Sequence, residues 1–102
     1  NKMDITKKTG LSQEVLDEII KLAKKYRIKK LKLFGSRARG DFQRASDIDL
    51  AVQGGDIVRF SLDVDEFTPT LLKYDIVDLD LVSEEELLQA IEKEGVLLYE
   101  EI

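Results

Sequence analysis

Two aspartates separated by one residue form the pair in this sequence with the clearest chemical meaning. Asp47 and Asp49 flank Ile48 at the start of an apolar run that continues to Val52. Alternate side chains of a β-strand point to the same face, so a strand here would hold the two carboxylates about 6–7 Å apart. At an effective dielectric constant of about 20 they would repel each other by roughly 2–3 kcal/mol. A hard divalent cation such as Mg²⁺ removes this repulsion and also takes substrate phosphates as ligands. The pair therefore predicts a metal site that works on phosphate groups.

The residues before this acidic pair suit a phosphate-bearing substrate. Gly35 and Ser36 directly follow residues 30–34, which are predicted to form a strand. A glycine lets a polyanion approach the backbone closely, and free N–H groups at a helix start can face it. Ser36 adds a hydroxyl donor, while Arg37 and Arg39 can fork onto phosphate oxygens. Because no long apolar stripe follows Arg37, we expect it to bind substrate and to have no role in the core.

The inventory of reactive side chains narrows the chemistry further. The chain has 102 residues and contains no cysteine and no histidine. It therefore has no disulfides, no thiolate or histidine metal site, and no Ser-His-Asp or Cys-His catalysis. Carboxylates, lysines and hydroxyls remain. Together with a hard metal ion, they favour phosphoryl or nucleotidyl transfer over acyl transfer.

Length and hydropathy indicate one compact domain over residues 1–102. An apolar content of 43% is sufficient for one core, and the length is common for a single domain. No apolar stretch approaches the length of a membrane span, and no signal peptide precedes the first predicted helix. We therefore expect a cytoplasmic protein that does not contact a membrane.

Charge is divided unevenly along the chain, whose net charge is −5. Residues 1–44 hold 13 Lys+Arg and 5 Asp+Glu, whereas residues 45–102 hold 3 and 16. The first half can face a polyanion, and the second can supply metal ligands or meet a basic partner. A basic run from Lys24 to Lys32 is either a solvated surface or a landing site for nucleic acid or an acidic partner. A free-standing nucleic-acid binder would more often be basic overall.

Apolar periodicity predicts helices and strands in alternation around the acidic pair. Ser12 should cap the first helix, Gly40 should end the second, and Ser83 should begin a capping box for the last. Residues 1–11 show no clear pattern, and residues 56–73 fit either a helix or an irregular segment. The predicted helices span 13–26, 36–40 and 83–94, the predicted strands span 30–34, 47–53 and 74–82, and 96–99 is a short strand or a packed tail.

The spacing of the two motifs resembles that of a known enzyme superfamily. Gly-Ser at 35–36, ten further residues, and Asp-x-Asp at 47–49 match the signature of the polymerase-β-like nucleotidyltransferases. The surrounding Gly-Ser-Arg-Ala-Arg-Gly-Asp and Ser-Asp-Ile-Asp-Leu-Ala-Val resemble its smallest branch, the minimal nucleotidyltransferases (MNT), with the MntA-like antitoxins of HEPN/MNT pairs. This resemblance implies an α+β nucleotidyltransferase fold, αβαβαβα around a small mixed β-sheet. The plainer interpretation is a glycine turn followed by a strand that begins with acidic residues.

The resemblance implies a third carboxylate on the next core strand. Three candidates, Asp75, Asp78 and Asp80, lie within residues 74–82. The two-residue period of a strand places Asp75 on an otherwise apolar face, where an unpaired charge is costly. The other two lie with Ile76 on a face that can be polar. The corresponding family strand uses its first acid in catalysis, so we choose Asp75 and keep Asp78 as the runner-up.

The resemblance also implies a reaction and roles for the site residues. A nucleotide would pass from ATP, or another nucleoside triphosphate, to an acceptor hydroxyl with release of pyrophosphate. Asp47, Asp49 and Asp75 would be catalytic and would hold two Mg²⁺ ions, and Asp75 would help remove the acceptor proton. The residues expected to bind the nucleotide are Gly35, Ser36, Arg37 and Arg39.

The acceptor is expected to come from a partner protein. Larger relatives add a domain that binds the acceptor, whereas this chain ends soon after its third predicted strand. In the minimal branch the partner is typically a HEPN-type protein, a helical ribonuclease toxin, so nucleic acid would be contacted only indirectly. We expect AMP to be transferred to a tyrosine of such a toxin. The alternative is a binding-type antitoxin with weak catalysis that neutralises its partner by contact.

Overall fold

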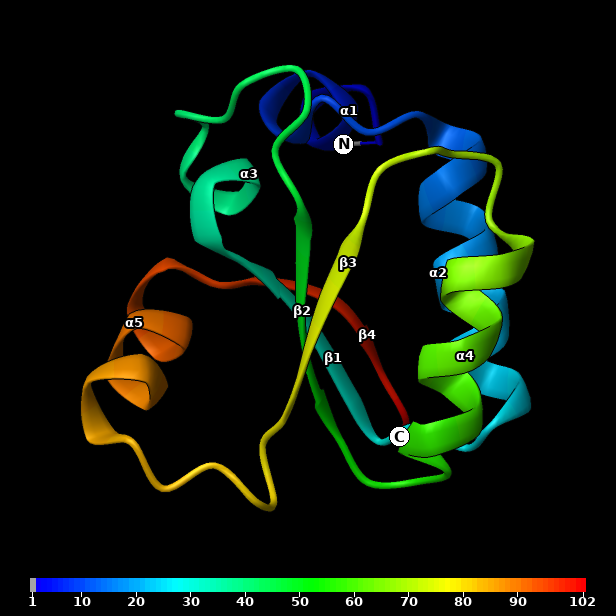
Figure 1. Cartoon of the computed structure of the whole chain (residues 1–102), viewed down its shortest axis with the longest axis vertical. Helices are drawn as coiled ribbons and strands as arrows, with labels where there is room; N and C mark the ends of the chain where they lie inside the picture. Colours follow the sequence, from blue (N-terminus) through cyan, green and yellow to red (C-terminus); the bar gives the residue numbers. More distant parts are fainter. Residues whose placement is uncertain (1) are drawn as a thin grey trace.

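A four-stranded mixed sheet with helices on both faces forms the framework of the protein (Figure 1). The computed structural model describes residues 2–102, with side chains from Ile5 onward. The helices are α1 (Lys2–Thr9), α2 (Gln13–Lys25), α3 (Gly35–Arg39), α4 (Ile57–Phe67) and α5 (Glu85–Glu94). The strands are β1 (Lys30–Phe34), β2 (Ile48–Gln53), β3 (Tyr74–Asp78) and β4 (Val96–Glu100). The order contains the predicted αβαβαβα series, preceded by α1 and followed by β4.

The sheet places the two acidic strands side by side. Its strand order is β3-β2-β1-β4. β1 is antiparallel to both of its neighbours, whereas β2 and β3 are parallel. A parallel pair needs a crossover connection, and α4 supplies it. In the resulting register, Asp49 of β2 lies between Phe34 of β1 and Asp75 of β3.

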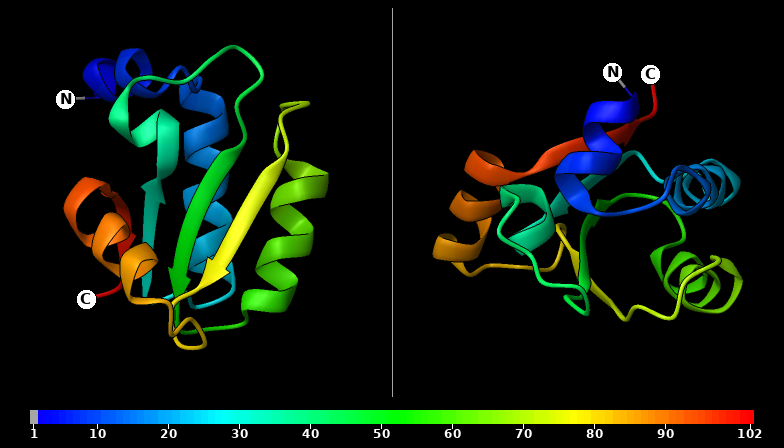
Figure 2. Two further views of the ribbon diagram at one scale, coloured as in Figure 1. Left: turned by 60° about the vertical axis from the view of Figure 1, so that its left-hand side comes forward. Right: turned by 90° about the horizontal axis from the view of Figure 1, so that it is seen from above.

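The main core lies between one face of the sheet and the two helices α2 and α4, which Figure 2 shows on the same side. Ile48, Leu50 and Val52, which alternate along β2, are all completely buried in it. α2 contributes an apolar stripe at helical spacing that includes Val15 and Ile19. The alternation along β2 therefore sends its apolar residues to the core and its one acid, Asp49, to the opposite face.

That opposite face is only partly covered. α3 and α5 lie on this side, at the left of Figure 1. Phe34, Ala51 and Ile91 form a small buried cluster under α5. Asp49 is half-buried and Asp75 is exposed. The acids thus occupy a part of the sheet face that the helices leave open to solvent.

Most of the predicted element ends are confirmed. The Ser12 hydroxyl accepts a hydrogen bond from the backbone three residues on and caps α2, and Gly40 ends α3 in the left-handed conformation, with φ 95°. The predicted capping box is wrong, because Glu84 precedes α5 and makes no side-chain cap hydrogen bond. β3 is shorter than predicted: it ends at Asp78, and residues 79–81 turn away from the sheet.

Two segments without a clear sequence signal are helical. α1 occupies most of residues 1–11, of which residue 1 lies outside the described part. In residues 56–73, α4 buries Phe60 and Val64 in the main core and stops before Pro69. No helix within residues 2–102 is long and apolar enough to cross a membrane.

Candidate functional site

The Asp49 carboxylate lies against the glycine of the Gly-Ser motif. Gly35 has φ +74°, a conformation that favours glycine. A Cβ atom added there would collide with Oδ2 of Asp49. The strand–turn junction after β1 therefore needs a glycine for two reasons, its backbone conformation and the space that the carboxylate occupies. The motif was expected to admit a polyanion, and the anionic group that approaches it in the structure is this side chain.

The electrostatics of Asp49 reflect crowding by other acids. The pKa of its carboxyl rises to about 6, because burial disfavours the charged form and because Asp75 and Asp47 add negative charge nearby. Arg39 and Arg37 act in the opposite direction. A carboxylate that is half-buried among like charges is costly unless a cation approaches it. The carboxylate oxygens of Asp47, Asp49 and Asp75 are of the kind that a hard divalent cation prefers.

The structure brings Asp75 to Asp49 and keeps the other two candidate acids away. Asp75 is the register partner of Asp49, whereas Asp78 is the partner of Val52 near the far end of β2. Asp80 lies beyond β3, where its carboxylate accepts a hydrogen bond from the backbone N–H of Gly54. One expectation about the strand is wrong: the face that Asp78 shares with Ile76 is not polar, because Ile76 packs against the main core.

Asp47 completes an open group of acids. It is exposed and directly precedes β2, so it belongs to the end of the loop after α3. Among the described side chains, no group of three or more acids is arranged so that it could hold a metal ion as it stands. The site is therefore an open arrangement in which Asp47 and Asp75 act on Asp49 from two sides.

Arg37 does not have the surface position that the sequence suggested. Only 1% of the residue is exposed. Its Nε donates to the carbonyl of Ser46 at 3.0 Å, Nη1 to that of Thr9 at 2.9 Å and Nη2 to that of Arg44 at 3.2 Å. Burial lowers the pKa of the guanidinium. The expectation that Arg37 has no role in the core is wrong, because all three of its nitrogens are engaged by backbone carbonyls.

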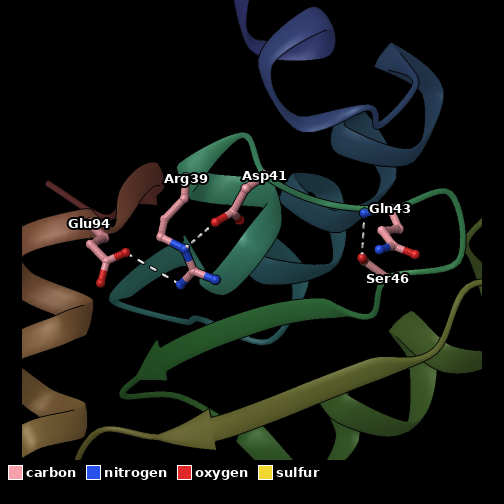
Figure 3. A network of polar contacts seen from close by, with 5 residues as sticks. All are labelled: Arg39, Asp41, Gln43, Ser46 and Glu94. Carbon is pink, nitrogen blue, oxygen red and sulfur yellow. Dashed lines mark hydrogen bonds and ion pairs between the residues drawn. The ribbon is translucent and has the colours of Figure 1, made fainter.

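Arg39 and Ser36 lie nearer to solvent on the same short helix. Figure 3 shows Arg39 between two carboxylates, with Nε 3.2 Å from Asp41 and Nη1 3.4 Å from Glu94 of α5. Those carboxylates raise the pKa of Arg39, and the hydrogen bond that Arg39 donates to Asp41 contributes most. Ser36 is half-buried in the first turn of α3. Sequence reasoning missed Glu94, because no local pattern links α5 to α3.

Part of the basic run is paired within the molecule. Arg27 forms an ion pair with Glu101 at 3.0 Å, and Lys32 forms one with Glu92 at 3.4 Å. Lys24 lies 5.9 Å above the ring of Tyr99. The acidic second half of the chain thus neutralises basic residues of the first half, which favours the solvated-surface interpretation of the run.

Comparison with known proteins points to one family. Residues 17–101 match the family model described as polymerase beta, nucleotidyltransferase. A candidate protein adenylyltransferase of Methanocaldococcus jannaschii is 48% identical over 68 residues, which are 65% of this chain and 66% of that protein, slightly less than two thirds of its length. A toxin–antitoxin crystallised with AMP-PNP superposes with a TM-score of 0.69 and 29% identity, covering 84% of this chain and 73% of that one. A mutant of the MntA-HpeT toxin–antitoxin gives a TM-score of 0.68 and 26% identity over the same shares.

Proposed function

The chain belongs to the polymerase beta nucleotidyltransferase family, and we propose that it transfers AMP, or another nucleoside monophosphate, from a nucleoside triphosphate to a hydroxyl group of a partner protein. The observation that carries this proposal is the meeting of Gly35, Asp49 and Asp75 at one end of the β2–β3 pair. A half-buried carboxylate whose pKa is raised by burial and by neighbouring acids is typical of a functional site.

In the proposed reaction, the acceptor hydroxyl oxygen bonds to the α-phosphorus while the bond from that phosphorus to the bridging oxygen breaks. Pyrophosphate leaves, and the hydroxyl proton passes to Asp75 or to solvent. Asp47, Asp49 and Asp75 would hold two Mg²⁺ ions, and bound Mg²⁺ would supply activation of the acceptor oxygen and neutralisation of the triphosphate charge. Ser36 and the Gly35 backbone would orient the phosphates. Arg39 would have to exchange its carboxylate partners for phosphate oxygens.

We place the acceptor on a partner protein, a HEPN-type toxin. The relative from M. jannaschii is named for protein adenylylation, and both solved structures are toxin–antitoxin structures. The surface of this chain also suits a partner, since the large apolar residues exposed on α4 and just after it are Val58, Leu62, Phe67 and Leu71. Acidic residues lie among them, so a basic partner would be attracted electrostatically.

The test is incubation with Mg²⁺, labelled nucleoside triphosphates and the protein encoded by the neighbouring gene. Mass spectrometry should find added AMP on a hydroxyl of that protein, and we expect the hydroxyl of a tyrosine. Asp75→Asn should abolish transfer, while the matched Asp78→Asn should retain it because Asp78 lies at the other end of β3. Neutralisation of the partner without modification would favour the contact-only antitoxin. Efficient transfer to a free small molecule, with the partner unmodified, would contradict the proposed acceptor.

A further inference from the structure

We propose that Arg37 is a positioning residue that fastens the loop carrying Asp47 to the end of α1. This inference rests on the proposed function for the importance of Asp47, but its structural part does not. Arg37 is almost completely buried, and the described structure gives it no carboxylate within ion-pair distance. A guanidinium in such a position is retained only if its donors are well satisfied.

The carbonyls that satisfy Arg37 lie on two separate segments. Arg44 and Ser46 belong to the loop between α3 and β2, whereas Thr9 is the last residue of α1. The carbonyl of Ser46 is part of the peptide bond to Asp47, so the contact from Nε, at 3.0 Å, holds the group immediately before the acid. The planar fork of an arginine can reach three carbonyls at once, and a lysine cannot.

The loop between α3 and β2 is closed by hydrogen bonds of its own, and Arg37 connects it to the rest of the fold. The backbone N–H of Gln43 donates to the Ser46 hydroxyl at 2.8 Å, as drawn in Figure 3, and the N–H of Ser46 donates to the Gln43 carbonyl at 3.0 Å. These bonds close residues 43–46 into a tight turn. They do not attach the turn to another element, so its position depends on Arg37.

The α1 side of this anchor is equally specific. Thr9 is completely buried, and its hydroxyl donates to the Ile5 carbonyl at 2.6 Å. Helix ends leave carbonyls without an intrahelical partner. The Thr9 carbonyl accepts its hydrogen bond from Nη1 of Arg37 instead. The Phe42 ring covers the guanidinium at 4.9 Å. Gly10, with φ +69°, leaves room for that ring, since an added Cβ would collide with it. Residues 9 and 10 precede the family match, which begins at residue 17.

Two variants test the hydrogen bonds that join the loop to α1, one at Arg37 itself and one at Gly10 next to the end of α1. A third variant is the matched control. Arg37→Lys keeps the positive charge but removes the fork. Gly10→Ala keeps the arginine but places a Cβ atom against the Phe42 ring and 3.1 Å from Nη1 of Arg37. Arg44→Lys makes the same chemical change at an exposed side chain of the loop. Hydrogen exchange is followed by mass spectrometry over residues 41–47, and Mn²⁺ affinity is followed by electron paramagnetic resonance, at a temperature well below each melting transition.

In both test variants the backbone amide hydrogens of residues 41–47 should exchange at least about tenfold faster than in the unmodified chain, because the charge-assisted hydrogen bonds of Arg37 are lost or weakened. Their Mn²⁺ affinity should fall by roughly tenfold, the usual effect of losing a residue that orients a ligand. Arg44→Lys should match the unmodified chain in both measurements. Gly10→Ala decides the question if Arg37→Lys fails to fold.

Unchanged loop exchange in a folded variant would overturn the anchor. Faster exchange with unchanged Mn²⁺ affinity would overturn the positioning role and leave only a structural one. Failure of the unmodified chain to bind Mn²⁺ would instead count against the proposed metal-dependent function, and the exchange data would still decide whether Arg37 holds the loop.

Discussion

The two faces of the sheet differ in what they do with the side chains of β2: one face buries them completely and the other leaves Asp49 partly open to solvent. On the face covered by α2 and α4, Ile48 and Leu50 are completely buried. On the other face, Asp49 lies half-buried beside Asp75, where helices cover the sheet incompletely. One face gains stability from burial of apolar groups, whereas on the other face burial and like charges together raise the pKa of Asp49. The difference teaches that one face of this strand contributes apolar packing, whereas the other carries the acids to which we assign chemistry.

The largest expected effect is on the apolar face. Leu50→Ala should lower the free energy of unfolding by about 2–5 kcal/mol, because it creates a cavity in a fully packed core. Urea denaturation followed by circular dichroism measures this loss. A change below about 1 kcal/mol, within the range of an ordinary surface substitution, would mean that the two faces do not differ as described.

Gly35→Ala should have the next largest effect. Alanine is strained by about 1–2 kcal/mol in a left-handed conformation, and its Cβ would displace the Asp49 carboxylate. Stability and Mn²⁺ affinity should therefore both fall. Gly54→Ala is a suitable control, because that glycine also has a positive φ and the atoms nearest to its added Cβ belong to Lys29 and not to an acid of the site. Equal loss of Mn²⁺ affinity in the two variants would contradict a specific role for Gly35.

The pH dependence of the free energy of unfolding should reveal the cost of keeping Asp49 charged on the partly covered face of the sheet. The folded-state pKa of Asp49, about 6, is above the ordinary value of 3.8 for an aspartate. The folded protein therefore holds this proton more tightly, so its stability falls as pH rises from about 4 to about 6 and stays lower above that range. The shift sets an upper limit of about 3 kcal/mol, which solvent screening of a partly exposed group reduces.

Asp49→Asn should flatten this part of the profile and leave the metal-free protein as stable as the unmodified chain, or more stable, at pH 7. Chemical denaturation in a metal chelator between pH 4 and pH 8 measures both effects. A large loss of stability in Asp49→Asn at pH 7 would show that the carboxylate supports the fold instead of straining it.

The smallest effect should come from Glu94→Gln. Arg39 and Glu94 are partly exposed, and such an ion pair is worth at most about 1 kcal/mol, so the melting temperature should change little. Because Arg39 is no longer paired with residue 94, the affinity of the protein for a nonhydrolysable triphosphate should rise by roughly twofold to fivefold. This corresponds to up to about 1 kcal/mol. Isothermal titration with the magnesium complex measures it, and Glu92→Gln is the exposed control on the same helix. Equal affinity in all three proteins would place the nucleotide away from Arg39.

Local sequence was sufficient for the features that depend on short-range geometry. The two-residue period of a strand correctly separated Ile48 and Leu50 from Asp49, and it correctly separated Asp75, the register partner of Asp49, from Ile76. These two inferences succeeded because side-chain direction along a strand follows from backbone geometry alone. The Gly-Ser and Asp-x-Asp spacing correctly indicated the family.

Only the tertiary structure decided the features that depend on long-range contacts. Arg37 and Arg39 stand two residues apart in one short helix, yet one is held by three backbone carbonyls and the other by two partly exposed carboxylates. Apart from the Arg39–Asp41 contact, their partners lie farther along the chain, in α1, in the loop before β2 and in α5, so the sequence next to the helix does not distinguish the two arginines. A guanidinium is long enough to lie along either surface of its helix, so its role is set by the groups that the complete fold brings within its reach.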